Sequence, residues 1–202
     1  MTIDWRGVFP AVTTQFTEDL SIDYADTQRV VDDLIKDGVT GIIAMGTCGE
    51  NNSLTAEEKR TLLKAIVEVV AGRVPVVTGV SELTTPLAIA WVKDAEKLGA
   101  NGLMLLPAMV YVPKTAELVE HFTQVANATT LPIMLYNNPT AYRVAITNEA
   151  LEALRPVKNI VAVKESTADT RRFTDMINAF GDRYVVFAGL DDVAFEGLLL
   201  GA

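Results

Sequence analysis

The chain has 202 residues, of which 50% are hydrophobic, and a formal net charge of −9 at pH 7. This composition supports a sizeable core and argues against global disorder. The acidic balance, with no basic run, argues against binding to nucleic acid through its phosphate backbone. Cys48 is the only cysteine and His121 the only histidine. An intramolecular disulfide and a cysteine-based metal site are therefore excluded.

The first residues, Met1 to Asp4, contain no basic segment followed by an apolar one, so no signal peptide is predicted. No apolar run is long enough to cross a bilayer. We therefore expect a soluble, cytoplasmic protein that does not interact with membranes.

Apolar, β-branched segments alternate with amphipathic segments along the chain. The predicted strands cover residues 7–16, 41–45, 74–79, 102–106, 132–136, 160–164 and 184–188. The predicted helices cover residues 24–36, 55–70, 85–98, 115–128, 148–154, 168–180 and 193–199. Gly38 ends the first helix, and Thr55 with Glu58 forms a capping box at the start of the second.

Seven such βα units predict a parallel sheet covered by helices. No Gly-x-Gly-x-x-Gly pattern follows any strand, which disfavours a dinucleotide-binding sheet. Seven units are one fewer than in an eight-stranded barrel. We therefore predict a (β/α)8 TIM barrel. Residues 1–202 would form a single domain, truncated at the C-terminus, whose first strand exposes an apolar edge.

Lys164 ends the predicted strand 160–164 and is the only lysine that ends such a strand. A buried ammonium is costly unless it is paired or used. Burial favours the neutral, nucleophilic amine that Schiff-base enzymes need. The structural alternative is an ion pair with a nearby carboxylate, for which Glu50 and Asp191 are candidates, and ion pairs of this kind are common.

Other polar residues also follow strand ends, where such barrels carry their active sites. The loop at residues 46–49 offers free amide groups and the Thr47 hydroxyl to a carboxylate, or is simply a tight turn. Tyr136 either relays protons or caps the core. Tyr111 faces either the site or a neighbouring subunit. We expect Cys48 to be a small buried residue and His121 to be a helix-surface or packing residue.

Three motifs on three strand ends resemble the dihydrodipicolinate synthase / N-acetylneuraminate lyase family of class I Schiff-base aldolases. They are Gly46-Thr47-Cys48-Gly49-Glu50, Tyr136-Asn137-Asn138-Pro139 and Val163-Lys164-Glu165-Ser166. The resemblance implies that Lys164 forms the Schiff base with a 2-oxo acid and that Tyr136 shuttles protons. It implies that Thr47 and the Cys48 amide hold the substrate carboxylate. Asn138, Gly189 and Tyr111 are further substrate-binding candidates.

The resemblance also implies a chain of about 300 residues, with an eighth βα unit and a C-terminal helical region, that assembles as a homotetramer or homodimer. It implies no metal and no cofactor besides the covalent lysine imine. Three positions depart from the synthase. Cys48 stands where the synthase has the second residue of a Thr-Thr pair, while the catalytic relay hydroxyl of Thr47 remains. Ala141 stands where the synthase has an arginine for its second substrate, with Arg143 displaced by two residues. Tyr111 is shifted from the tyrosine that a neighbouring subunit lends to the proton relay.

Segments at residues 5–10, 136–139, 169–173 and 187–192 resemble members that deaminate 1-pyrroline-4-hydroxy-2-carboxylate to 2-oxoglutarate semialdehyde and ammonia. A lyase that acts on this cyclic imino acid is therefore the first functional prediction. The alternatives are a 4-hydroxy-tetrahydrodipicolinate (dihydrodipicolinate) synthase, which condenses pyruvate with aspartate semialdehyde, or another pyruvate-dependent aldolase. A non-catalytic binding barrel is the alternative of a different class.

Overall fold

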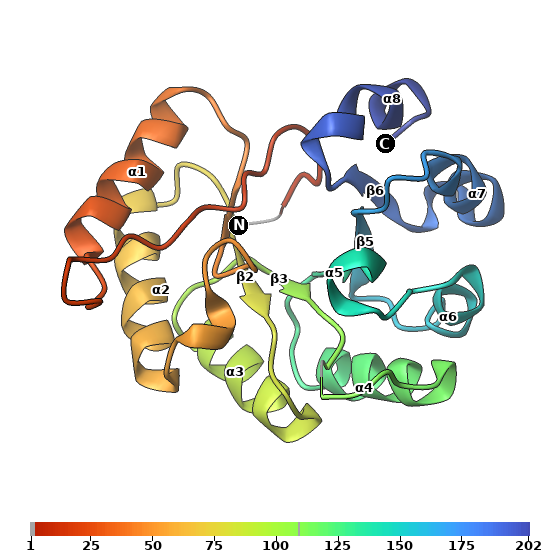
Figure 1. Ribbon diagram of the computed structural model, residues 1–202, viewed down its shortest axis with the longest axis horizontal. Helices are drawn as coiled ribbons and strands as arrows, with labels where there is room; N and C mark the ends of the chain where they lie inside the picture. The colour runs from red at the N-terminus through yellow and green to blue at the C-terminus, as the bar shows by residue number, and fades with distance from the viewer. Residues whose placement is uncertain (1–2, 109) are drawn as a thin grey trace.

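The computed structural model describes residues 3–108 and 110–202. Its described residues contain one parallel sheet, in which the strands lie side by side in chain order. Figure 1 shows the strands at the centre of the molecule and the helices around them. The strands are β1 (Ile42–Ala44), β2 (Val76–Val80), β3 (Gly102–Leu105), β4 (Ile133–Asn137), β5 (Ile160–Glu165) and β6 (Val185–Ala188).

The helices follow the strands closely, as the alternating pattern predicts. They are α1 (Tyr24–Lys36), α2 (Ala56–Val70), α3 (Thr85–Lys97), α4 (Thr115–Asn127), α5 (Pro139–Tyr142), α6 (Asn148–Ala153), α7 (Arg171–Phe180) and α8 (Ala194–Leu199). The predicted capping box of α2 is confirmed: the Thr55 amide donates to the Glu58 carboxylate over 2.7 Å, and the Glu58 amide donates to the Thr55 hydroxyl over 3.3 Å. None of the described helices is long and apolar enough to span a bilayer.

The predicted first strand, residues 7–16, is wrong as a strand, and the prediction of seven units is not confirmed. The segment lies beside β1 but makes only one isolated parallel bridge, between Ala11 and Ile43. The Val12 amide donates to the Ile43 carbonyl over 3.0 Å, and the Ile43 amide donates to the Pro10 carbonyl over 2.9 Å. Pro10 has no N–H group, so the ladder does not continue through it. Six strands therefore form the sheet in the described part of the chain.

Aromatic side chains connect this N-terminal segment to the last strand. The ring of Phe9 lies 5.5 Å from the ring of Phe187 on β6, nearly perpendicular to it, and Trp5 lies 6.3 Å from Phe187. Because the segment also contacts β1, the two edges of the sheet approach each other, as in a curled sheet. Several large apolar side chains of the N-terminal segment, β6 and α8 are exposed. They are Val8, Val185, Phe195, Leu198 and Leu199.

The strands bury both of their faces, which explains why their sequences are almost purely apolar. Successive residues alternate between two clusters. Ile42 packs outward against the helices, and Ile43 packs into the interior of the curl. Tyr136, at the carboxyl end of β4, is a buried member of the inner cluster, and the partly buried Tyr142 packs against that cluster. The interior therefore ends in a hydroxyl group at the rim where active sites of such barrels are built.

Candidate active site

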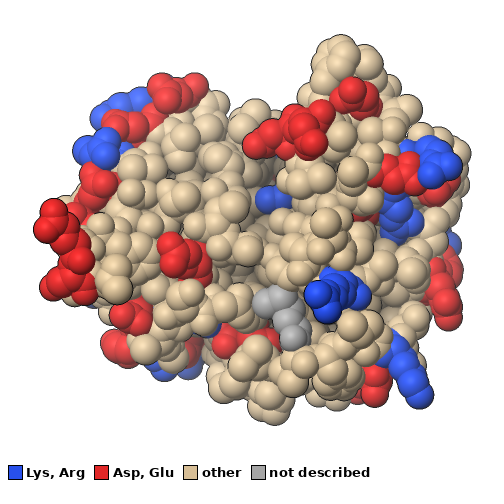
Figure 2. Space-filling view, in the orientation of Figure 1, with Lys and Arg blue, Asp and Glu red and all other residues tan. Residues whose placement is uncertain are grey.

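Lys164 and Tyr136 are register partners on neighbouring strands, β5 and β4. The Lys164 Nζ atom lies 5.0 Å from the centre of the Tyr136 ring, within the range of a cation–π contact. Within residues 3–108 and 110–202, no carboxylate forms an ion pair with Lys164, and Glu50 and Asp191 are both exposed. The structural alternative of an ion pair is therefore wrong. In Figure 2 the face is hollowed at its centre, and a basic side chain is visible in the hollow.

A second tyrosine, which the sequence did not suggest, joins Tyr136 to the loop after β1. The Tyr142 ring lies edge-on to the Tyr136 ring, with 5.8 Å between their centres. The Tyr142 hydroxyl is hydrogen-bonded to the Thr47 hydroxyl. Asn138 donates from its Nδ2 atom to the Tyr136 hydroxyl over 3.2 Å. The structure thus brings together four of the predicted site positions: Lys164, Tyr136, Thr47 and Asn138.

The loop that carries Thr47 is held by close backbone packing. Met45 adopts a left-handed conformation with φ of 51°, which is strained for a residue with a side chain. Its carbonyl oxygen lies so near β2 that a Cβ atom on Gly79 would be only 1.9 Å away. A glycine at position 79 is therefore required by this turn. The loop exposes both Thr47 and Cys48. The prediction that Cys48 is buried is wrong, because the tight turn directs positions 47 and 48 outward at the rim.

Gly189 lies directly against the lysine. Its amide donates to the Glu165 carbonyl over 2.8 Å. A Cβ atom at this position would lie 2.9 Å from Lys164 Cγ and 2.1 Å from Ser166 Oγ. The Ser166 hydroxyl is fully buried and has no hydrogen-bond partner among the described residues. The absence of a side chain at position 189 thus leaves room for the present conformations of Lys164 and Ser166.

We expect Gly189→Ala to reduce turnover about 10²-fold, because a displacement of about 1 Å at a reacting group has this effect. The new methyl group would collide with Ser166 and press on the lysine stem. Steady-state kinetics, with a thermal melt to confirm folding, measure the effect. Wild-type kinetics in a folded Gly189→Ala variant would show that the lysine tolerates displacement and that the close contact is unimportant.

A buried polar network fixes the carboxyl ends of β4 and β5 on the outer side of the sheet. Glu165 is fully buried and accepts two hydrogen bonds from Asn137 Nδ2, of 2.9 and 2.8 Å. Arg172 on α7 forms an ion pair with Glu165 at 3.3 Å. Burial raises the pKa of Glu165, while Asn137 and Arg172 oppose that rise. The side-chain Oδ1 atom of Asn137 also accepts from the Ile146 amide over 2.8 Å.

Replacement of Asn137 by alanine is expected to lower the free energy of unfolding by about 3 kcal/mol. It leaves a buried carboxylate and the Ile146 amide short of partners, and each such group costs about 1–3 kcal/mol. Urea denaturation followed by circular dichroism measures the loss. Asn127→Ala is the matched control, since Asn127 is exposed and is expected to change stability by less than about 0.5 kcal/mol. Equal stability of both variants would contradict this role of Asn137.

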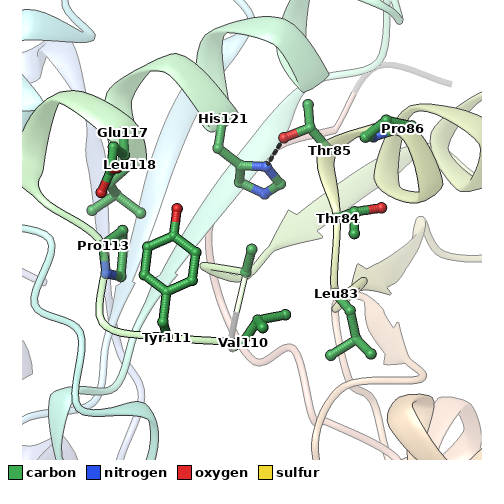
Figure 3. Close-up of a pocket in the computed structure, with 11 residues that line it drawn as sticks. Leu83, Thr84, Thr85, Pro86, Val110, Tyr111, Pro113, Glu117, Leu118 and His121 are labelled. Carbon is green, nitrogen blue, oxygen red and sulfur yellow. Dashed lines mark hydrogen bonds between the residues drawn. The ribbon is translucent and has the colours of Figure 1, made fainter.

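Tyr111 does not lie with Lys164, Tyr136, Thr47 and Asn138. It lines a cavity of about 320 Å³ between the first turns of α3 and α4, together with His121 (Figure 3). His121 is buried, its Nδ1 atom lies 2.9 Å from the Thr85 hydroxyl, and burial lowers its pKa. His121 is thus a packing residue, which is one of the two expected roles. Met109, in the same loop, lies outside the described residues.

Tyr142 and Ser166 are the residues of this region to which sequence reasoning gave no role. A signal for Tyr142 was present: Asn138 and Pro139 are the preferred residues for an N-cap and a first helical position. Asn138 caps α5 by accepting from the Ala141 amide over 3.1 Å. One helical turn then returns residue 142 to the side of residue 138. No comparable signal exists for Ser166. The burial of its hydroxyl without a hydrogen-bond partner depends on how the chain after β6 packs beside β5.

The fold and the site define a class of protein: an incomplete parallel β/α barrel with a lysine above a tyrosine at its carboxyl rim. The chain belongs to the dihydrodipicolinate synthetase family, whose sequence model matches residues 4–202. Enzymes of this family are lyase-type aldolases that use a pyruvate-derived lysine Schiff base and no additional cofactor. The described residues contain no cluster of three or more His, Cys, Asp or Glu side chains arranged for a metal ion.

Similar proteins are found among both sequences and solved structures. The chain is 33% identical over 201 residues to the 4-hydroxy-tetrahydrodipicolinate synthase of Desulforamulus reducens, covering 99% of this chain and 68% of that protein. It is 36% identical over 199 residues to the same enzyme from Clostridium perfringens, covering 98% of this chain and 67% of that protein. The chain therefore spans about two thirds of the length of these relatives, and only 64% of the synthase from Alkaliphilus oremlandii.

Solved structures agree with this assignment. The Bacillus anthracis dihydrodipicolinate synthase DapA-2 superposes with a TM-score of 0.95 at 34% identity, covering 100% of this chain and 69% of that one. The prophage protein YagE of E. coli K12, described as a member of the dihydrodipicolinic acid synthase family in complex with pyruvate, gives 0.94 at 31% identity, covering 99% and 68%. Neither set of relatives supports the narrower prediction of a deaminase.

Proposed function

We propose that this chain carries the Schiff-base site of a pyruvate-dependent lyase of the 4-hydroxy-tetrahydrodipicolinate synthase type, with Lys164 as the nucleophile. The observation that carries the proposal is the position of the lysine. Its amine lies 5.0 Å above the Tyr136 ring at a strand end, and no carboxylate among the described residues pairs with it. An amine in such a place is available to attack a carbonyl carbon.

The neighbouring groups fit the steps of imine formation. Lys164 adds to the C2 carbonyl of pyruvate, and the resulting carbinolamine loses its hydroxyl group as water when Tyr136 supplies a proton. Asn138 orients the Tyr136 hydroxyl through its 3.2 Å hydrogen bond. Thr47 and Cys48 are both exposed, and the Thr47 hydroxyl and the two backbone amides would receive the carboxylate of the substrate. Gly189 leaves room beside the lysine.

The relatives favour the synthase over the deaminase. The curated relatives described above are named 4-hydroxy-tetrahydrodipicolinate synthase. YagE and a dihydrodipicolinate synthase from Acinetobacter baumannii are both described as complexes with pyruvate. Ala141 stands at the position of the arginine that would bind the carboxylate of the second substrate. The identity of the second substrate is therefore less well supported than that of pyruvate. Because α5 places Ala141 on an exposed turn, a carboxylate would have to find another partner there.

A two-substrate assay tests the reaction. The purified protein, shown by a cooperative melt to be folded, is supplied with pyruvate and aspartate semialdehyde, and separately with 1-pyrroline-4-hydroxy-2-carboxylate. We expect consumption of pyruvate that depends on the aldehyde. Release of ammonia and 2-oxoglutarate semialdehyde from the cyclic imino acid, with no reaction of pyruvate, would replace the synthase by the deaminase. No reaction in either assay would favour a binding barrel.

Assembly, location and domain organisation remain predictions. We infer that residues 1–202 belong to one barrel domain, that the protein is cytoplasmic, and that it acts on a small molecule as a homotetramer or homodimer. A monomeric variant of dihydrodipicolinate synthase is among the solved structures that resemble this chain, at a TM-score of 0.91 and 29% identity. The oligomeric state therefore does not follow from the fold. Sedimentation velocity measures it directly.

A further inference from the structure

Tyr142 is held in place by the same residue that orients Tyr136. The Tyr142 amide donates to the Asn138 carbonyl over 3.0 Å, and the Asn138 side chain accepts from the Ala141 amide. The Nδ2 atom of the same side chain donates to the Tyr136 hydroxyl. Asn138 therefore fixes the two tyrosines relative to each other. The position of Tyr142 is therefore determined by the hydrogen bonds of this turn.

Tyr142 also connects two parts of the chain that are 95 residues apart in sequence. Its hydroxyl is hydrogen-bonded to the Thr47 hydroxyl at the exposed rim. Its ring contacts Tyr136 edge-on at 5.8 Å, and Tyr136 is only 8% exposed beneath Lys164. Tyr142 thus lies between Thr47 at the rim and the buried phenol beside the lysine: it contacts Thr47 through a hydrogen bond and Tyr136 through its ring.

The surroundings of Tyr142 favour the protonated form of its phenol. Burial raises its pKa above the ordinary value of 10.0, and the nearby Tyr136 adds to the rise, whereas the hydrogen bond to Thr47 opposes it. The phenol is therefore neutral at neutral pH and keeps a proton that it can donate. A purely structural bond between the β1 loop and α5 would need the hydrogen bond to Thr47, but it would not need the contact with Tyr136.

We propose that Tyr142 is a positioning residue for proton transfer at Lys164: its hydroxyl fixes the Thr47 hydroxyl and its ring holds the Tyr136 ring, so that the Tyr136 proton exchanges with solvent at this rim within one chain. This inference rests on the proposed function. In carbinolamine dehydration, the Tyr136 proton goes to the departing hydroxyl group, which leaves as water. In enamine formation, the C3–H bond of the bound pyruvate breaks and its proton goes to the Tyr136 oxygen. The electron pair of the broken C3–H bond forms the C2=C3 bond, while the π electron pair of the C=N bond moves to the nitrogen of Lys164.

Exchange at pyruvate C3 reports this path separately from imine formation. In D2O, the methyl protons of pyruvate are replaced by deuterium only if Tyr136 exchanges its newly gained proton with solvent before returning it to C3. Loss of the methyl signal in proton NMR measures the rate of this exchange. Borohydride reduction followed by mass spectrometry measures imine formation at Lys164 on the same protein. The first reaction requires that the Tyr136 proton exchange with solvent, whereas the second requires Lys164, pyruvate and a single proton from Tyr136.

The decisive variant is Tyr142→Phe, which keeps the ring against Tyr136 and removes the hydrogen bond to Thr47. We expect C3 exchange to fall about 10²-fold, with little change in the KM for pyruvate and with the Lys164 adduct still formed. The dependence of exchange on pH should also change, which loss of a structural bond alone would not cause. Tyr24→Phe is the matched control, because the Tyr24 hydroxyl, at the start of α1, makes no hydrogen bond to any described residue.

A double variant tests the link to Thr47. If Tyr142 acts through Thr47, then Thr47→Val slows exchange as well, and the combined Thr47→Val/Tyr142→Phe variant is barely slower than either single variant. Thermal melts establish that all variants are folded. Independent, multiplying effects of the two substitutions would overturn the coupling.

The outcomes separate this inference from the proposed function. Wild-type exchange in Tyr142→Phe, with a normal Lys164 adduct, overturns the role of Tyr142 and leaves the Schiff-base lyase intact. Slow exchange in Tyr111→Phe, with no effect of Tyr142→Phe, also overturns it, because the path would then run through the loop after β3. Absence of both adduct and exchange in the folded wild-type protein removes the proposed function, and the inference with it.

Discussion

Lys164→Met is expected to reduce turnover by roughly 10⁴-fold or more. Methionine has nearly the length of lysine and is compatible with the apolar wall of the strand, but it has no amine to form the imine, so the covalent path is lost completely. The contact with the Tyr136 ring shows that an apolar neighbour already lies beside this side chain. Steady-state assays with pyruvate, together with a thermal melt, measure activity and folding.

Lys158→Met is the matched control, since Lys158 is exposed and lies just before the opposite, amino end of β5. It is expected to retain wild-type activity. Substantial turnover in a folded Lys164→Met variant would mean that Lys164 is not the nucleophile. In that case the unpaired ammonium at the strand end would have a structural or binding role.

Tyr136→Phe is expected to reduce turnover by about 10²- to 10⁴-fold, the range typical of a general acid–base group. Phenylalanine keeps the ring 5.0 Å below the Lys164 amine, so the lysine should keep its position. Only the hydroxyl that accepts from Asn138 is lost. Rapid-quench measurements with borohydride should show a slower rate of adduct formation while its position on Lys164 is unchanged.

The prediction for Tyr136 has a clear opposite outcome. If Tyr136→Phe reacts at the wild-type rate, then Tyr136 only packs beneath the lysine and caps the core. The proton must then come from another group, for which Tyr142 is a candidate because its ring contacts Tyr136 and its hydroxyl is hydrogen-bonded to the exposed Thr47.

Local sequence patterns predicted much of this fold because the information they need is local. From residue 24 onward, alternation of apolar and amphipathic segments located the strands and the longer helices, and Thr55 with Glu58 located the start of α2. The first strand was predicted wrongly because its apolar residues resemble a strand, whereas Pro10 interrupts the hydrogen-bond ladder.

Site features that depend on contacts distant in sequence were not predictable in the same way. The strand-end positions of Lys164 and Tyr136 followed from the pattern, because carboxyl ends of parallel strands meet at one rim. The contact of Tyr142 with Thr47 depends on how a single helical turn lies across the barrel. The exposure of Cys48 depends on the Met45 carbonyl, which approaches β2 only because position 79 is glycine.

Borohydride trapping with pyruvate tests the role of Lys164 most directly. The folded protein is incubated with pyruvate, reduced, digested and mapped by mass spectrometry, with Lys164→Met treated in parallel. We predict one adduct, on the peptide that contains Lys164, and no adduct in Lys164→Met. An adduct on a different lysine, or none on the folded protein at saturating pyruvate, would contradict a Schiff-base site at Lys164.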